Sequence, residues 1–383
     1  MISRRVCVVT GARADYGLLQ PVMRELRDAP EFDLQLLVSG MHLSAEFGLT
    51  YRAIEEDGFT IDDRIEMLLS GDTPVAIAKS IGLATIGFAD AFARLQPDLV
   101  VLLGDRYELL AAAQAALVAN IPIAHIAGGD TTEGAFDEAI RHSITKMAQL
   151  HFVTNREAHR RVVQLGEDPA HVFDFGSPGI DAIQRTRLLD RAALEASLGF
   201  TLLPRNLLVT FHSVTLEYAA AGEQFDELLA ALEEFADTGL IFTLPNSDTN
   251  GRALIGKIDA FVRTHAHARA YAALGQQRYF STIAQVDAVV GNSSSGLYEV
   301  PTFKKPTVNI GDRQRGRLQP ASVVNCPPQR AAIAAAIRRA LALDCAAVVN
   351  PYGSGNAAAR IVATLKTVSD FRSLIKKHFH DLP

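Results

Sequence analysis

The chain has 383 residues, of which 48% are hydrophobic and 21% are charged. This length exceeds what one hydrophobic core usually serves, so we expect about two globular domains. The net charge of −6 gives no electrostatic reason to expect nucleic acid or an anionic membrane as a partner, although a local basic loop can still bind a small anion.

The three cysteines are far apart and form no Cys-x-x-Cys pair. Cys7 lies in an apolar, strand-like run, where we expect a buried, inert thiol and therefore a reduced, cytoplasmic protein. The apolar stretch near Met1 is too short for the core of a signal peptide, and no run of roughly 18 apolar residues occurs. The sequence thus predicts no membrane anchor.

The N-terminal half alternates short apolar runs with helical segments. Continuous β-branched runs are typical of buried parallel strands, and the alternation predicts a doubly wound sheet. Polar, glycine-rich loops follow several strands, where such a sheet places its ligand crevice. The predicted strands are Val6–Thr10, Asp33–Ser39, Asp98–Leu103, Ile121–Ile126, Leu150–Thr154 and His171–Phe175, and the clearest helices are Tyr107–Asn120 and Phe136–Gln149.

A second series of strands and helices follows a break at Gly176–Gly179. Its clearest strands are Leu207–Phe211, Leu240–Leu244, Ala288–Gly291 and Thr307–Ile310, and its clearest helices are Ala331–Leu343 and Asn356–Lys377. We therefore predict an α/β protein with two doubly wound, Rossmann-like domains facing a cleft, as in glycosyltransferase-B-like folds. The predicted boundaries are 1–180 for the first domain, 181–365 for the second, and 366–383 for a last helix that packs back on the first.

Common cofactor motifs do not occur. There is no Gly-x-Gly-x-x-Gly after the first strand, no P-loop and no His-Glu-x-x-His, which disfavours nicotinamide, P-loop and zincin enzymes. The histidines at positions 151, 159, 171, 265, 267, 378 and 380 show no spacing typical of metal ligands. We expect neither a cofactor nor a metal.

Two loops are candidates for binding phosphate. Arg13 lies in the loop Gly11–Gly17 beside a predicted helix start, where it could clamp phosphate or be a solvated arginine in an ordinary turn. The run Gly291–Glu299 contains three serines between glycines, which can donate hydroxyl and backbone hydrogen bonds to a pyrophosphate. Its alternative role is serine capping of a helix.

Carboxylates gather after the strands of the first half. Asp105 follows the most apolar strand and is suited to proton transfer or to capping the next helix. Asp130 closes a glycine-rich loop, and the helix beyond it carries two pairs spaced i,i+4, which are either surface ion pairs or groups that face a ligand. These pairs are Asp137 with Arg141 and Glu138 with His142. His212 ends the first strand of the second domain, where it is either structural or directed at the cleft.

Together these loops resemble the hydrolysing UDP-N-acetylglucosamine 2-epimerase family of the sialic-acid and legionaminic-acid pathways. The resemblance runs in order along nearly the whole chain and implies the two-domain fold predicted above. The matching segments are Gly11–Gly17, Ser39–Ser44, Leu103–Glu108, Gly128–Lys146, Gly176–Gly179, Thr210–Thr215, Pro245–Arg252, Asn292–Pro301, Gly311–Arg317 and Asn350–Asn356.

The resemblance also implies roles for individual residues. Asp105 and Asp137 match the family's acid/base carboxylates, and His212 would contact a phosphate or sugar group. Relatives often carry Glu where this chain has Ala127, so Asp130 or a water would take over that carboxylate's part. UDP would be held by Arg13, Ser293, Ser294, Ser295, Gly296 and Glu299, the last at the ribose, and the sugar by His42, Glu138, Arg141, His142, Asn246 and Asp248.

The implied reaction removes the C2 proton while UDP departs, hydrates the resulting 2-acetamidoglucal, and leaves the free manno sugar. The partners are then a UDP-amino sugar and water, and we expect a homodimer or homotetramer. The amino sugar stays open between UDP-N-acetylglucosamine and a UDP-2,4-diacetamido-trideoxyglucose. The alternatives are a non-hydrolysing epimerase, whose relatives carry Arg-Pro-Glu where this chain has Arg13–Asp15, a UDP-sugar glycosyltransferase, and a UDP-sugar-binding module.

Overall fold

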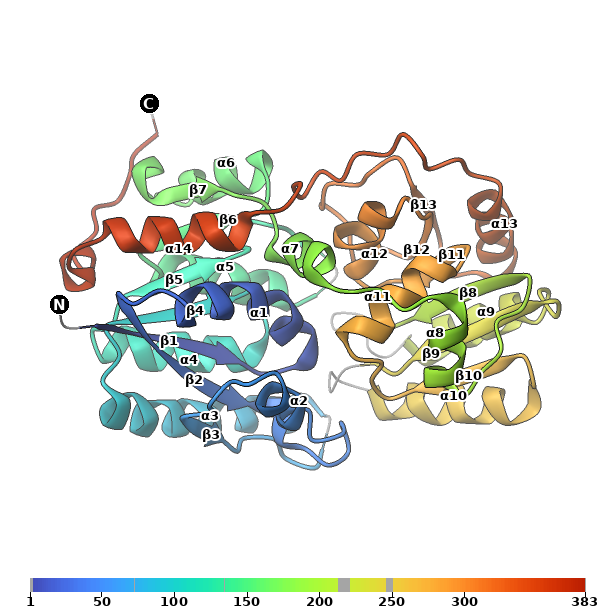
Figure 1. Cartoon of the computed structure of the whole chain (residues 1–383), viewed down its shortest axis with the longest axis horizontal. Helices are drawn as coiled ribbons and strands as arrows, with labels where there is room; N and C mark the ends of the chain where they lie inside the picture. Colours follow the sequence, from blue (N-terminus) through green and yellow to red (C-terminus); the bar gives the residue numbers. More distant parts are fainter. Residues whose placement is uncertain (1–2, 72, 134, 213–220, 246–250, 383) are drawn as a thin grey trace. The chain divides into compact units, whose positions relative to one another are not determined.

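The structure, a computed structural model, describes residues 3–71, 73–133, 135–212, 221–245 and 251–382. It divides into two compact units, each built around one parallel sheet (Figure 1). Unit 1 comprises Met1–Asp130, Asp137–Gln184 and Tyr352–Pro383, and unit 2 comprises Thr131–Phe136 and Arg185–Pro351.

In the described part of the chain, the sheet of unit 1 has seven strands in the order β3-β2-β1-β4-β5-β6-β7, and every pairing is parallel. The strands are β1 (Arg4–Thr10), β2 (Phe32–Ser39), β3 (Asp63–Ile65), β4 (Leu99–Leu103), β5 (Ile123–Ile126), β6 (Leu150–Val153) and β7 (Val172–Asp174). The doubly wound prediction is confirmed here. β3 was not predicted, because a charged segment of three residues lacks the apolar run that marks a strand.

The helices of unit 1 flank this sheet. They are α1 (Arg13–Arg27), α2 (Tyr51–Glu56), α3 (Pro74–Leu95), α4 (Tyr107–Val118), α5 (Asp137–Met147), α6 (Arg156–Gln164), α7 (Pro178–Arg185, whose last residue belongs to unit 2) and α14 (Ala357–Thr367), with 3-10 turns η1 (Gly40–Leu43), η2 (Pro169–His171) and η4 (Phe371–Leu374).

Unit 2 repeats the same architecture. Over the described residues its sheet has six parallel strands in the order β10-β9-β8-β11-β12-β13. The strands are β8 (Arg205–Thr210), β9 (Thr238–Thr243), β10 (Ala268–Tyr271), β11 (Ala288–Gly291), β12 (Thr307–Ile310) and β13 (Val323–Cys326). The helices are α8 (Arg191–Leu198), α9 (Ala221–Leu232), α10 (Gly251–Thr264), α11 (Gln276–Gln285), α12 (Ser295–Tyr298), α13 (Arg330–Leu341) and the 3-10 turn η3 (Val300–Phe303).

Strand order locates the place where each sheet can bind a ligand. The order reverses between β1 and β4 in unit 1 and between β8 and β11 in unit 2, and ligands of open parallel sheets bind at the carboxyl ends of the strands at such a reversal. Central strands are buried on both faces, as the adjacent residues Val8 and Val9 of β1 illustrate. The loops after β1, β4, β8 and β11 lie at these two reversals and are therefore the candidate ligand-binding loops.

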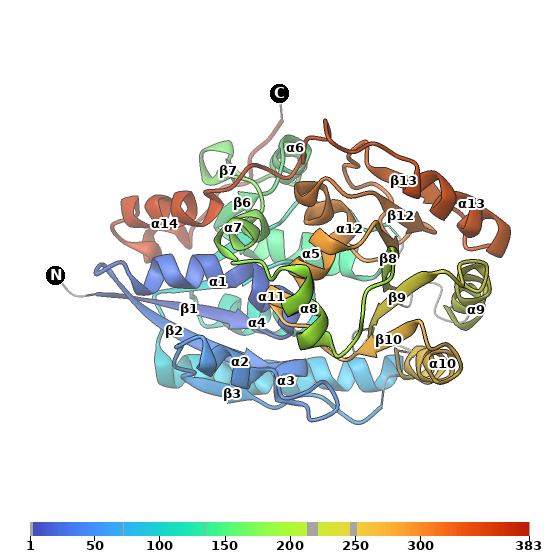
Figure 2. The ribbon, with the colours of Figure 1, turned by 45° about the vertical axis from the view of Figure 1, so that its right-hand side comes forward.

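The C-terminal segment differs from its prediction in two ways. The chain returns to unit 1 at Tyr352, earlier than the predicted 366–383, because Asp181 accepts hydrogen bonds from the amides of Ala357 and Ala358 at 3.1 and 2.6 Å and so anchors the start of α14. α14 lies beside α1 (Figures 1 and 2).

The predicted helix Asn356–Lys377 is also interrupted, since α14 ends at Thr367 and η4 follows separately. The carboxylate of Asp370 accepts from the amide of Arg372 at 2.9 Å and starts that new turn. Cys7 is buried as predicted, and burial raises the pKa of its thiol, consistent with an inert residue.

Helix α3 is long and apolar enough to cross a membrane by length and composition, with 33% of its most apolar window buried. It packs along α4 within unit 1. Core helices of water-soluble proteins can have the same length and composition, so this helix is weak evidence for a membrane span.

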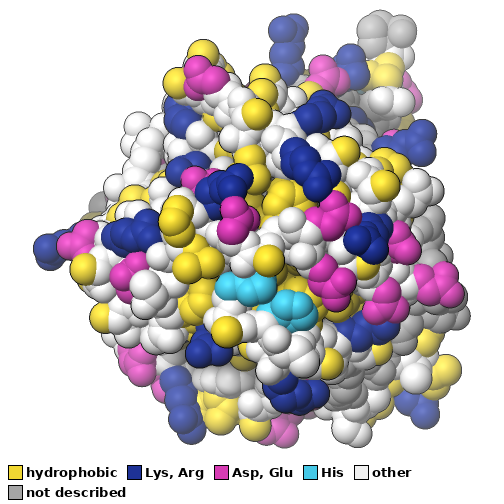
Figure 3. All heavy atoms as spheres, turned by 90° about the vertical axis from the view of Figure 1, so that its right-hand side faces the viewer, with side chains coloured by type: hydrophobic (Ala, Val, Ile, Leu, Met, Phe, Trp, Pro, Cys, Tyr) yellow, Lys and Arg dark blue, Asp and Glu magenta, His cyan; other side chains and the backbone are white. Residues whose placement is uncertain are grey.

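On the face drawn in Figure 3, lysine and arginine side chains are interspersed with aspartate and glutamate.

Candidate functional site

The loop after β1 is organised by Asp15, which the sequence did not single out. Its buried carboxylate accepts from the amides of Gly11 and Ala12 at 2.8 and 2.7 Å and from the hydroxyl of Thr10 at 3.0 Å. Burial raises the pKa of Asp15, and the Gly11 hydrogen bond opposes that rise. A carboxylate thus occupies loop amides that hold phosphate in dinucleotide-binding folds. Arg13, the first residue of α1, is half-buried beside this loop.

His42, predicted to contact the sugar, lies buried beside this loop. Its Nε2 is 3.0 Å from the hydroxyl of Thr10 and its Nδ1 is 2.8 Å from that of Thr50. Burial lowers the pKa of His42 to about 3, so the ring is neutral at physiological pH. The ring supports the loops after β1 and β2, and its contact with a sugar stays a prediction.

A second buried acid, Glu108, packs under the same loops. A Cβ atom added to Gly11 would lie 3.2 Å from the Glu108 side chain, and one added to Gly40 would lie 2.7 Å from its Oε1. The carboxylate pairs with Arg106 at 3.0 Å and is fully buried. Burial raises the pKa of Glu108, and the Arg106 charge opposes it. The glycines therefore make room for a charged pair.

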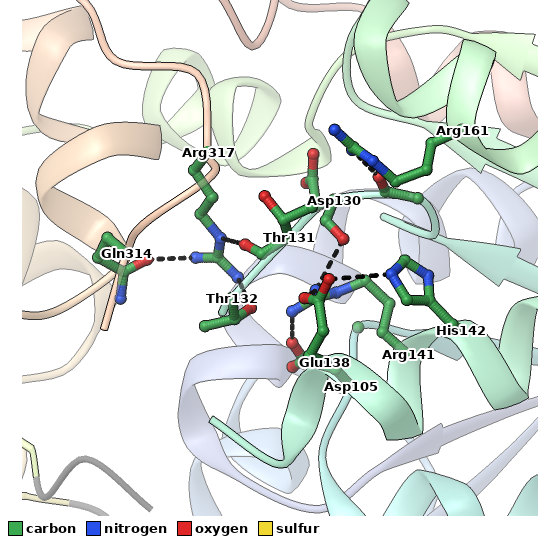
Figure 4. Close-up of polar contacts among 12 residues, drawn as sticks. Asp105, Asp130, Thr131, Thr132, Glu138, Arg141, His142, Arg161, Gln314 and Arg317 are labelled. Carbon is green, nitrogen blue, oxygen red and sulfur yellow. Dashed lines mark hydrogen bonds and ion pairs between the residues drawn. The ribbon is translucent and has the colours of Figure 1, made fainter. Parts of the chain in front are cut away.

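Arg141 contacts several of the residues predicted for the site in unit 1 (Figure 4). Arg141, on α5 and only 1% exposed, donates to the carboxylate of Asp105, to Glu138 Oε2 at 2.8 Å and to the carbonyl of Asp130 at 2.8 Å. The N-cap residue of α4 is Arg106, so Asp105 lies one residue before the cap position. Asp105 is held as an ion-paired carboxylate at the end of β4.

Asp130 is buried and fixed from the loop after β6. Thr154 donates to one of its carboxylate oxygens at 3.0 Å and Asn155 to the other at 2.9 Å. Asn155 also caps α6, accepting from the amide of Ala158 at 2.8 Å. A residue that caps one helix thereby orients a carboxylate predicted to be catalytic.

His125 supports the loop that carries Asp105. Its Nε2 lies 2.8 Å from the carbonyl of Gly104, and its Nδ1 lies 3.1 Å from the hydroxyl of Thr145. Because a carbonyl only accepts, Nε2 carries the proton and Nδ1 accepts from the threonine. Burial lowers the pKa of His125 to about 3 and keeps this neutral form.

Helix α5 begins with the acidic residues Asp137 and Glu138, where carboxylates are favoured by the helix dipole. The predicted pair of Glu138 with His142 is present at 3.0 Å. The Nδ1 atom of His142 is buried and has no hydrogen-bond partner among the described residues. Arg141 pairs with Glu138 three residues before it. These pairs therefore form a partly buried network around Asp105, unlike the predicted alternative of isolated surface ion pairs.

In unit 2, His212 and Asn292 join the ends of β8 and β11. The His212 amide donates to Asn292 Oδ1 and Asn292 Nδ2 donates to the His212 carbonyl, both at 2.8 Å. Gly291, just before Asn292, has a φ of 140°, and a Cβ there would lie 1.8 Å from the carbonyl oxygen of Thr210. Only glycine allows this close approach of the two strands.

The serine loop follows this junction. Ser294 is the N-cap residue of α12 and in the described part of the chain its side chain makes no capping hydrogen bond, whereas the hydroxyl of Ser293 accepts from the amide of Ser295, the first residue of α12, at 3.4 Å. One serine of the run therefore does meet an amide at the start of this helix. α12 spans only Ser295–Tyr298, and one helical turn contributes only a weak dipole at its N-terminus. The hydroxyl of Tyr279 donates to Ser295 at 2.6 Å.

Glu299 closes the serine loop. Its Oε2 atom is buried without a hydrogen-bond partner among the described residues, and burial raises the pKa of its carboxyl group. Gly296, also predicted in this loop, is buried against Thr307. Asn246 and Asp248 lie outside the described residues, and within the described ranges no group of three or more potential metal ligands occurs.

Known proteins match the whole chain. The family model for UDP-N-acetylglucosamine 2-epimerase matches residues 24–366. A GDP/UDP-N,N'-diacetylbacillosamine 2-epimerase (hydrolyzing) of Campylobacter jejuni is 40% identical over 326 residues, 85% of each chain. The chain belongs to the UDP-N-acetylglucosamine 2-epimerase family. A polysialic acid biosynthesis protein of Escherichia coli is 37% identical over 99% of this chain and 98% of that protein.

The fold of this 2-epimerase family member also matches a solved structure. The UDP-N-acetylglucosamine 2-epimerase of Methanocaldococcus jannaschii in complex with UDP-N-acetylglucosamine and UDP superposes with a TM-score of 0.82 at 17% identity, covering 95% of this chain and 100% of that one. At this identity the match establishes the glycosyltransferase-B-like fold.

Several residues that organise this epimerase's candidate site escaped the sequence reasoning. These residues, which hold the loops and carboxylates described above, are Asp15, Glu108, His125, Thr154 and Asn155. Their shared signal is a polar residue at or just after the end of a parallel strand, or in the first turn of the helix that follows.

Proposed function

We propose that the chain is a hydrolysing 2-epimerase that converts a UDP-linked N-acetylamino sugar and water to the free manno-configured sugar and UDP. The observation that carries this proposal is the cluster around Arg141, which holds Asp105, Glu138 and the Asp130 loop together. The C. jejuni relative, named as hydrolyzing, supports this reaction over the non-hydrolysing and glycosyltransferase alternatives.

The reaction needs one base and one acid. In the first step a carboxylate takes the C2 proton, the C2–H electrons form the C1–C2 double bond, and the C1–O bond breaks so that UDP leaves with its electron pair. In the second step water adds at C1 and a proton is delivered to C2 from the opposite face. We assign the base to Asp105, an ion-paired carboxylate, and the acid to Asp137 or Asp130. Each transfer typically contributes about 10²–10⁴-fold.

We assign the UDP group to the residues that the family resemblance implies. Ser293, Ser294, Ser295 and Gly296 offer hydroxyls and amides to the pyrophosphate, Arg13 adds a positive charge, and His212 contributes from the end of β8. The unpartnered Oε2 of Glu299 supports its role toward ribose hydroxyls, because a buried carboxylate oxygen without a partner is costly unless a ligand supplies one.

The sugar is assigned to the residues that neighbour these carboxylates. Glu138 and His142 are in hydrogen-bond contact on α5, beside Arg141, and His42, Asn246 and Asp248 complete the proposed set. Arg141, predicted to contact the sugar, is assigned a supporting role. As a nearly buried guanidinium engaged with protein oxygens, it acts through Asp105 instead of touching the sugar.

We infer that the substrate is a UDP-2,4-diacetamido-trideoxyglucose, with UDP-N-acetylglucosamine as the second candidate. The former follows the name of the C. jejuni relative and points to a legionaminic-acid-type precursor, whereas the E. coli relative's name points to sialic acid. We propose a cytoplasmic homodimer or homotetramer, needing neither cofactor nor nucleic acid. Val75, Leu83 and Ile86 on α3 and Val118 on α4 are exposed apolar side chains, and sedimentation of charged variants there tests the assembly.

The deciding experiment incubates the purified protein with each UDP-sugar in D₂O and follows UDP and sugar. We expect stoichiometric UDP and a free manno sugar carrying one deuterium at C2. An epimerised sugar still linked to UDP would indicate the non-hydrolysing reaction, and turnover only with an added acceptor would indicate a glycosyltransferase. Binding of UDP without release from either sugar would indicate a binding module, and free product lacking C2 deuterium would refute elimination.

A further inference from the structure

The segment Thr131–Phe136 lies in sequence between the proposed catalytic residues Asp130 and Asp137, yet it belongs to unit 2. Arg317, in the loop after β12, holds it there (Figure 4). The guanidinium donates from Nε to the carbonyl of Thr131 at 2.8 Å and from a terminal nitrogen to the hydroxyl of Thr132 at 3.1 Å. Both threonines are largely buried. One arginine therefore fixes the main chain and a side chain of this segment.

The same guanidinium is tied to the serine loop. Its other terminal nitrogen donates to Gln314 Oε1 at 2.7 Å, and Gln314, fully buried, donates to the carbonyl of Asn292 at 2.8 Å. The guanidinium also lies 5.4 Å from the ring centroid of Tyr298 on α12, within the range of a cation–π contact. Arg317 thus contacts both ends of the proposed UDP-binding loop, through Gln314 at Asn292 and directly at Tyr298.

Gly316 lets this segment pack closely. Its φ is +86°, and a Cβ there would lie 2.5 Å from Thr131 Oγ1 and 2.9 Å from Glu133 Oε1. The amide of Glu133 donates to the carbonyl of Arg315 at 3.4 Å. The loop after β12 therefore makes backbone and side-chain contacts with the segment at adjacent residues, and a side chain at position 316 would force the side chains of Thr131 and Glu133 to move.

We propose that Arg317 is a positioning residue that couples occupancy of the Asn292–Tyr298 loop to the placement of Thr131–Phe136. Because Asp130 and Asp137 are covalently attached to the two ends of that segment, filling the loop would constrain where both carboxylates are held. This inference rests on the proposed function in one respect, namely that the loop binds UDP. The guanidinium suits the task because its planar fork can donate in three directions at once, which a lysine ammonium does not reproduce in the same geometry.

The test compares Arg317→Ala and Arg317→Lys with Arg315→Ala. Arg315 lies in the same loop and pairs with Glu133 of the same segment at 3.2 Å, but both side chains are exposed at 71% and 52%, so its removal is a matched control. We would measure hydrogen–deuterium exchange of amides 131–136 with and without saturating UDP. We expect UDP to slow this exchange in the wild type and Arg315→Ala, little in Arg317→Ala, and partially in Arg317→Lys.

Steady-state kinetics provide a second readout. Arg317→Ala should lower kcat by roughly 10- to 100-fold, as expected for a small displacement of catalytic groups, with a smaller change in KM. Thr132→Val removes the hydroxyl that Arg317 contacts and keeps the shape, whereas Thr132→Ser keeps the hydroxyl. We expect the valine variant to lose both coupling and kcat and the serine variant to retain them, and this pair also serves if Arg317→Ala does not fold.

The outcomes separate the two proposals. UDP-dependent protection of 131–136 that is equal in the wild type and Arg317→Ala, or equal in both Thr132 variants, would refute the coupling even if the protein is an active epimerase. Failure of the wild type to release UDP from either sugar, with protection by UDP still dependent on Arg317, would refute the proposed function and leave the coupling standing. A wild type that does not bind UDP would refute both.

Discussion

Arg141 and Asp105 form an ion pair between residues 36 apart in the sequence, with the arginine side chain 1% and the aspartate 22% exposed. Removing an arginine from water is costly unless carboxylates and carbonyls meet its donors. Here Asp105, Glu138 and the Asp130 carbonyl do so. The buried charge of Arg141 therefore holds the partly exposed carboxylates of Asp105 and Glu138.

Replacing Asp105 with Asn should lower turnover by roughly two to four orders of magnitude, because the amide cannot accept a proton. UDP affinity should persist, since the serine loop is built from other residues. Asp237→Asn, which removes a carboxylate from an exposed pair with Arg205, is the control and should leave turnover unchanged. The measurement is UDP release alongside UDP titration calorimetry. Near-wild-type turnover would shift the base to Asp130 or Asp137.

Replacing Ser294 with Ala should weaken UDP binding by about 1–3 kcal/mol, the range for an unmet hydrogen bond to a charged partner. The structure makes this a cleaner test than Ser295→Ala, because the Ser295 hydroxyl accepts from Tyr279 and its loss would disturb the free protein. Calorimetry with UDP decides the point, with Ser143→Ala as a comparison, because the Ser143 hydroxyl donates to the carbonyl of Ala139 within its own helix, α5. An unchanged dissociation constant would remove Ser294 from the proposed site.

Replacing Ala127 with Gly should stabilise the fold by about 1 kcal/mol. Ala127 has a φ of 62°, a left-handed conformation that costs an alanine roughly 1–2 kcal/mol and a glycine little. Ala119, with a φ of −75°, is unstrained, so Ala119→Gly should be neutral or destabilising. Urea unfolding of the two variants provides the measurement. A loss of stability in Ala127→Gly would show that the surrounding contacts, and not the backbone, set the energy at this position.

The buried neutral histidines predict a loss of stability in acid. Burial lowers the pKa of both His125 and His42 to about 3, whereas an unfolded histidine titrates near about 6.5. Between these values the unfolded state binds more protons, so the free energy of unfolding should fall as pH falls, by about 1.4 kcal/mol per pH unit for each ring.

The variant His125→Gln tests this pH dependence, because glutamine does not titrate. We would follow its free energy of unfolding from pH 6 to pH 4. The slope should be smaller than that of the wild type by about 1.4 kcal/mol per pH unit, the contribution of one histidine ring. Equal slopes for the two proteins would mean that the pKa of His125 in the folded protein is close to its value in the unfolded chain.

The sequence alone determined the architecture, because parallel strands buried on both faces appear as continuous apolar runs. Ala288–Gly291 and Thr307–Ile310 were predicted with the bounds that the structure gives. The short strands β3, β10 and β13 were missed, since outer strands of a sheet need fewer apolar residues. Positions of candidate residues after strands also followed from sequence, because a parallel sheet brings those ends to one edge.

Only the tertiary structure decided which of these residues meet. The contact of Arg141 with Asp105 joins α5 to the end of β4, and helical spacing, which relates residues three or four apart, does not indicate it. The contact of Arg317 with Thr131 joins residues 186 apart. Hydrophobic periodicity reports which face of an element is buried, but buried polar partners are chosen by geometry and by the cost of leaving a charge or an amide unmet.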